Sequence, residues 1–179
     1  DRVQRAIQEA QATTPVPNPK LERDVYLDHI DGILYGDDPK EGVIHGRQFS
    51  HADLRLAFTA PQGFQLANGS DAVQGLGPND TAMIFDGGRL TSAGSMSDYI
   101  SNTWAAKIRL QSLENMTING MEAATATASG NTRDGPVFLR LVAIRYDAST
   151  IYRFIFLSPA QNASAADAGF RQAAESFRK

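Results

Sequence analysis

Histidines are the first side chains to consider for metal chemistry in this 179-residue chain, because it contains no cysteine. Thiolate nucleophiles, disulfides and cysteine zinc sites are therefore excluded. His29 lies between Asp28 and Asp31, whereas His45 and His51 flank a predicted strand, six positions apart. On an unbroken strand this even offset points both imidazoles to one face, about 20 Å apart, which is too far for one ion to bridge. The HExxH pattern of zinc peptidases is absent.

Other motifs that carry chemistry are also missing. Asp37, Asp38 and Glu41 lack the regular spacing of a calcium loop, so we expect a solvated turn there. No G-x-S-x-G nucleophile motif occurs, and Gly75 and Gly77 lack the third glycine of a dinucleotide-binding loop. The sequence therefore predicts no catalytic, no cofactor-binding and no metal-ligating residue.

The composition is that of an ordinary globular protein. Apolar residues make up 42% of the chain, charged residues 21%, and the net charge of −3 gives no basic surface for nucleic acid. No apolar run approaches the roughly 18–20 residues that a membrane-spanning helix needs. We expect Trp104 in the core, and Arg140, Arg145 and Arg153 on the exposed side of predicted strands.

Two helices are predicted at the start of the chain. Residues 1–12 and 20–31 have apolar residues at helical spacing, and a stretch with three prolines in eight residues separates them. The opening, DRVQRAIQEA, is a charged amphipathic helix and not a signal peptide. We therefore treat 1–41 as a helical segment that precedes the main domain, either the tail of a preceding domain or a linker.

From residue 42 the apolar period becomes that of strands. Four strands are predicted before a helix at 96–107, with Ser95 or Ser97 as its N-cap, and about four strands after it. Asn119-Gly120 and the segment 147–150 predict hairpin turns, and the chain closes with a helix capped by Ser164. The predicted fold is α+β for residues 42–179, with a mainly antiparallel sheet and flanking helices.

Short motifs along nearly the whole chain resemble bacterial zinc metallopeptidases related to HtpX and the CAAX prenyl proteases. The motifs that carry this resemblance include Tyr26-Leu27, Ile30-Asp31-Gly32, Tyr35-Gly36-Asp37, Gly46-Arg47, Ala60-Pro61, Gly63-Phe64, Asn119-Gly120-Met121, Tyr152-Arg153-Phe154 and Ser176-Phe177-Arg178. The resemblance implies a non-catalytic C-terminal domain that assists substrate or partner binding. It implies a parent peptidase domain in cis as the partner, with zinc in that parent, and a location in the cell envelope, in the periplasm.

Two further interpretations stay open. The order of strands, an A-P-x-G-F segment, a helix, a long hairpin and a closing helix is similar to PsbP-like domains, which often act as docking modules. The chain is then a freestanding cell-envelope module that binds proteins without a peptidase parent. An unrecognised hydrolase, the third hypothesis, requires His45, His51 and Asp53 to cluster in a pocket.

Overall fold

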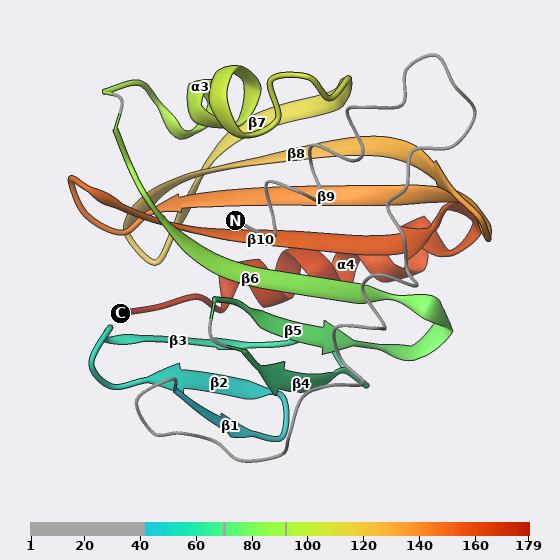
Figure 1. Cartoon of the computed structure of the whole chain (residues 1–179), viewed down its shortest axis with the longest axis horizontal. Coiled ribbons are helices and arrows are strands. Elements are labelled where there is room, and N and C mark those ends of the chain that lie inside the picture. Colours follow the sequence, from blue (N-terminus) through green and yellow to red (C-terminus); the bar gives the residue numbers. More distant parts are fainter. Residues whose placement is uncertain (1–41, 70, 92) are drawn as a thin grey trace.

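The computed structural model of the chain describes residues 42–69, 71–91 and 93–179. The predicted helical segment 1–41 lies outside these residues. The described part is α+β, as expected: two antiparallel sheets with helices on both faces of the larger one (Figure 1).

The smaller sheet has three strands in the order β1-β2-β3. We expected one strand between His45 and His51, but the chain turns back at Gly46, whose φ of 59° suits glycine, and forms a hairpin. Leu54 precedes β3 and is exposed. The strands are β1 (Val43–His45), β2 (Gln48–His51) and β3 (Leu56–Thr59).

The larger sheet has seven strands in the order β4-β5-β6-β10-β9-β8-β7, and every neighbouring pair is antiparallel. The last strand, β10, lies in the middle, between β6 and β9. Six strands instead of the predicted four precede the helix that begins at Met96. The strands are β4 (Gln65–Asn68), β5 (Val73–Leu76), β6 (Ala82–Arg89), β7 (Leu110–Ile118), β8 (Met121–Thr132), β9 (Gly135–Arg145) and β10 (Thr150–Pro159).

The helices are shorter than the sequence predicts. Ser95 caps α3 as expected, in a capping box with Asp98, but the helix passes into a π-type turn and ends at residue 104. Asn162, and not Ser164, occupies the N-cap position of α4. None of the described helices is long and apolar enough to cross a membrane. The helical elements are η1 (Pro78–Asp80), α3 (Met96–Tyr99), η2 (Ile100–Trp104), η3 (Ala160–Asn162) and α4 (Ala163–Glu175).

The large sheet separates two hydrophobic cores. Core 1, on the α4 side, is rich in phenylalanine and includes Phe58, Phe154 and Phe170. Core 2, on the α3 side, contains Trp104 and Ile151. Alternate residues of β10 therefore enter opposite cores, as the predicted period-2 pattern requires. Each fully buried side chain of this size contributes about 1.5–3 kcal/mol, so both cores stabilise the central strands.

Candidate functional site

Two of the three arginines that we expected on the exposed side of the sheet are buried. Arg140 and Arg153 are each 3% exposed, and Arg145 is only partly exposed. A buried guanidinium needs a carboxylate partner, and residues distant in the sequence supply one to each of the two. The expectation of solvated arginines was therefore wrong for Arg140 and Arg153, and their partners decide what each can do.

Arg153 forms a bidentate pair with Asp86 inside core 2. Its Nε and Nη2 donate to the two carboxylate oxygens at 2.8 and 2.6 Å, and its Nη1 donates to the Tyr99 hydroxyl at 3.1 Å. The guanidinium also lies 5.3 Å from the ring centre of Trp104. Burial raises the pKa of Asp86 despite the opposing effect of Arg153. Burial also opposes the charge of Arg153, but the hydrogen bond and charge of Asp86 outweigh it and raise the arginine pKa.

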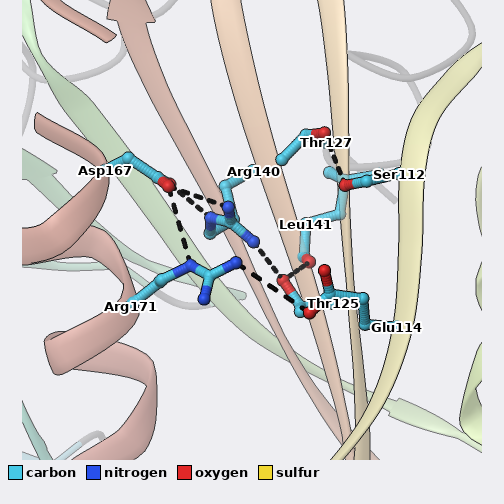
Figure 2. Close-up of polar contacts among 8 residues, drawn as sticks. All are labelled: Ser112, Glu114, Thr125, Thr127, Arg140, Leu141, Asp167 and Arg171. Atoms are coloured by element: carbon cyan, nitrogen blue, oxygen red, sulfur yellow. Dashed lines mark hydrogen bonds and ion pairs between the residues drawn. The ribbon is translucent and has the colours of Figure 1, made fainter. Parts of the chain in front are cut away.

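Arg140 anchors helix α4 to the sheet. Figure 2 shows its guanidinium between Asp167 of α4 and Thr125 of β8. Its Nε and Nη2 donate to the two carboxylate oxygens of Asp167, and the distance from Nη2 to Oδ2 is 2.9 Å. Its Nη1 donates to Thr125 Oγ1 at 2.8 Å. Thr125 in turn donates to the carbonyl of Leu141 at 3.0 Å. All three nitrogens of Arg140 are therefore engaged, so we interpret this cluster as structural.

The same network reaches β7 at the edge of the sheet (Figure 2). Arg171 lies 3.6 Å from Asp167 and 4.0 Å from Glu114, and it is half exposed. Ser112 and Thr127 share a hydrogen bond of 2.6 Å across β7 and β8. Among the residues that the structure describes, the Ser112 and Thr127 hydroxyls bond each other and no imidazole or carboxylate, so none of these residues activates them as a general base. The network joins β7, β8, β9 and α4.

An accessible recess lies on the α3 side, at the end of the sheet where β6 stops and β8 begins. It has a volume of about 660 Å³ and is shallow and open to solvent. Ligand pockets are usually of this volume, but they are deeper and lined by aromatic side chains. The recess is lined by Leu90, Thr91, Ala93, Gly94, Ser95, Glu122, Arg145 and Ala148.

An ion pair forms the polar wall of the recess. Arg145 Nε donates to Glu122 Oε2 at 2.7 Å, and Nη2 donates to the carbonyl of Gly94 at 2.5 Å. Glu122 Oε1 accepts from the backbone amide of Met96 at 3.0 Å. The hydrogen bond from Arg145 is the main reason that the pKa of Glu122 is lowered. Among the described residues, Nη1 of Arg145 has no hydrogen-bond partner, so it can donate to a ligand.

The recess suits binding better than proton transfer. A catalytic carboxylic acid near neutral pH needs a raised pKa, whereas Glu122 has a lowered one and stays ionised. The sequence placed Arg145 on the exposed side of a predicted strand but gave no sign that Glu122 and Gly94 would contact it. These two partners of Arg145 lie 23 and 51 positions away in the sequence, and only strand pairing brings them together.

The histidines are arranged differently from the expectation. His45 pairs with Gln48 across the β1–β2 hairpin, and His51 lies three residues beyond Gln48. Because three is an odd offset, His51 points to the opposite face of the small sheet from His45, about 10 Å further along the strand. The predicted shared face and the predicted spacing of about 20 Å were therefore wrong. His51 Nδ1 accepts from the amide of Leu54 at 3.3 Å, and neither histidine nor Asp53 lines the recess. Within the described ranges, no three His, Cys, Asp or Glu side chains are grouped to hold a metal ion.

Comparison with known proteins finds similarity in structure only. No protein-family model and no curated protein matches the chain. The solution structure of the PsbP protein CyanoP from Synechocystis sp. PCC 6803 matches 80% of this chain and 98% of that one, with a TM-score of 0.55 at 13% identity. LpqN of Mycobacterium tuberculosis, described as involved in cell envelope biogenesis, matches 80% of this chain and 86% of its own, with a TM-score of 0.53 at 9% identity. A protein of Bacteroides thetaiotaomicron VPI-5482 has a TM-score of 0.54 at 8% identity, over 75% of this chain and 48% of that chain.

These similarities correct the resemblance drawn from short motifs. The chain is not an accessory domain of an HtpX-like or CAAX-protease-like zinc metallopeptidase, because the structures that it resembles are PsbP-like and LpqN-like proteins. The parent peptidase and its zinc followed from that resemblance alone and lose their basis. At these identities the comparison establishes the fold and nothing finer. The described residues have a PsbP-like fold.

Proposed function

We propose that the protein is a freestanding, non-enzymatic binding module of the bacterial cell envelope that contacts a protein partner through the recess beside Arg145. The observation that carries the proposal is the polar wall of that recess. It presents an arginine that Glu122 and Gly94 already orient and whose Nη1 has no hydrogen-bond partner in the described part of the chain.

The shape and charge of the recess favour a polypeptide ligand. A shallow opening of about 660 Å³ admits a loop or an extended segment of a partner, whereas it cannot enclose a small molecule. Leu90 offers an apolar contact, and Arg145 can donate to a carbonyl or carboxylate of the partner. Holding the guanidinium in place before binding lowers the entropy lost on association.

The similarity to LpqN supports the envelope location. LpqN is described as a protein of cell envelope biogenesis, and this chain resembles it over most of its length. Fractionation of cells that express the natural full-length gene product tests the location. Recovery in the envelope fraction supports the proposal, and recovery with cytoplasmic markers contradicts it.

Photo-crosslinking in cells tests the recess. A benzoylphenylalanine at the exposed position Thr91 should capture one defined protein. The matched control carries the same group at Ala160, which is also exposed but lies at the other end of β10. Because a hydrogen bond to a charged group contributes about 1.5–3 kcal/mol, Arg145→Gln should lower the crosslink yield roughly tenfold or more. Equal capture from both positions, or capture unaffected by Arg145→Gln in a variant that is still folded, would reject the proposed binding site.

A further inference from the structure

The strand β7 is one of the two edges of the large sheet. It has nine residues and pairs with β8 on one side. On the other side, no strand pairs with it in the part of the chain that the structure describes. An edge of this kind presents unpaired amide and carbonyl groups, which can accept a further strand.

β7 has little of the protection that natural edges carry. Its sequence LQSLENMTI contains no proline and one charged residue, Glu114. At its centre, Leu113 is 39% exposed. Among the described residues only one other large hydrophobic side chain is exposed, Leu54 at 46%. A register shift between Leu110 and Ser112 is the only irregularity in the pairing of β7 with β8. An exposed leucine in the middle of an unprotected edge indicates a contact surface.

We infer that β7 pairs antiparallel with β7 of a second copy of this chain, about a two-fold axis at Leu113. In this register Leu113 faces Leu113 of the other copy, and each Glu114 faces a Ser112. A two-fold axis at Glu114 would place the two Glu114 carboxylates opposite each other. An axis midway between Leu113 and Glu114 would place each Leu113 opposite a Glu114. The pattern of apolar and charged residues therefore selects the axis at Leu113.

The charges near the axis are compatible with this pairing. In this pairing the two Glu114 residues are diagonal neighbours, about 7–8 Å apart, and do not face each other directly. Each has Arg171 of its own copy at 4.0 Å, and that side chain is 49% exposed. The irregular Gln111 lies outside the three central pairs, which involve residues 112–114. The large sheets of the two copies then join into one continuous sheet, in which the outward amide and carbonyl groups of each β7 bond the β7 of the other copy.

The dimer should be weak, because a single strand pair buries less surface than a typical stable interface. Its formation does not depend on the recess, which lies at the end of β8 next to the Asn119-Gly120 turn. The first test is the molar mass of the full chain over a concentration series. The mass should rise from 19.4 kDa toward twice that value. Leu113→Lys should stay monomeric, and the control Leu54→Lys should behave like the parent chain.

Cysteine crosslinking tests the register on a clean background, because the chain has no cysteine. Directly opposed residues have Cα atoms about 4.5–5.5 Å apart, which suits a disulfide. Leu113→Cys should oxidise to a covalent dimer at least tenfold faster than Leu54→Cys. A mixture of Ser112→Cys and Glu114→Cys should crosslink faster than either variant alone. A parent chain that is monomeric at every concentration, or equal rates for the cysteines at 113 and 54, would overturn the inference.

Discussion

At the scale of single residues, the strongest polar contacts of this protein stabilise its fold. The Asp86–Arg153 pair is bidentate, with both residues at 5% exposure or less. Removing one partner leaves the other charge buried and uncompensated. Arg153→Met should therefore lower the free energy of unfolding by about 3–5 kcal/mol, measured by urea denaturation.

Two further variants separate this cause from a simple loss of packing. Asp86→Leu combined with Arg153→Met removes both charges, so the double variant should recover most of the stability that the single variant loses. Arg171→Met removes a half-exposed arginine and should change the free energy of unfolding by less than about 1 kcal/mol. A double variant no more stable than Arg153→Met would show that the buried charge is not the cause.

Glu122 provides a prediction about pH. Its pKa is lowered from the ordinary glutamate value of 4.5, chiefly by the hydrogen bond from Arg145. A lowered pKa in the folded state means that this contact stabilises the fold above pH 4.5 and that the contribution is lost as the pH falls through the folded-state pKa. NMR titration should therefore place the midpoint of the Glu122 carboxyl below 4.5, and Arg145→Gln should move it back up. A midpoint that does not respond to Arg145→Gln would contradict the assigned cause.

At the scale of elements, the β7–β8 turn fastens the end of helix α4. The predicted Asn119-Gly120 turn is confirmed, and both residues have positive φ, 46° and 82°. The Asn119 side chain donates to the carbonyls of Glu175 and Phe177 at 3.1 and 2.7 Å. It therefore joins the turn to the helix end as well as forming the turn.

Substituting Asn119 separates these two roles. Asn119→Gly keeps the left-handed conformation and loses the two hydrogen bonds, which should cost about 1–2 kcal/mol of unfolding free energy. Asn119→Ala loses the same bonds and adds about 1 kcal/mol of backbone strain. Thermal or urea unfolding should find the parent chain most stable, Asn119→Gly less stable and Asn119→Ala least stable. Equal stability of the two variants would mean that backbone strain contributes nothing at this turn.

The elements that the sequence predicted well are those whose signal is local. β9 and β10 are long apolar runs, β10 with clear alternation, and Asn119-Gly120 and the segment 147–150 are turns formed by their own residues. The β1–β2 hairpin was missed because it depends on a turn at Gly46, directly after a strand of only three residues. Partners distant in the sequence could not be predicted at all. Arg140 and Arg153 looked like surface residues because their carboxylates lie 27 and 67 positions away.

At the scale of the whole molecule, the order of elements predicted more than the short motifs did. The order of strands and helices suggested a PsbP-like domain, and the solved structures bear this out. The motifs that suggested a metallopeptidase consist largely of glycine, proline, asparagine and aromatic residues, which turns and cores require in many unrelated folds. Such motifs carry little information about family, whereas the order of elements constrains how the sheet can be assembled.

The two cores should unfold together, because they share β8, β9 and β10. Alternate residues of these strands enter core 1 and core 2, so neither core can lose its packing while the central strands stay intact. Trp104 is the single tryptophan and lies in core 2, so its fluorescence reports on that core, while far-ultraviolet circular dichroism reports on the whole sheet. The two urea transitions should coincide.

Asn119→Gly gives a stricter test of whether the two cores unfold together. It weakens contacts at the end of α4, on the side of core 1 and away from Trp104. If the cores are coupled through the shared strands, this variant should shift the Trp104 transition as far as it shifts the circular dichroism transition. A Trp104 midpoint that stays at the parent value while the circular dichroism midpoint falls would mean that the α3 side unfolds as an independent unit.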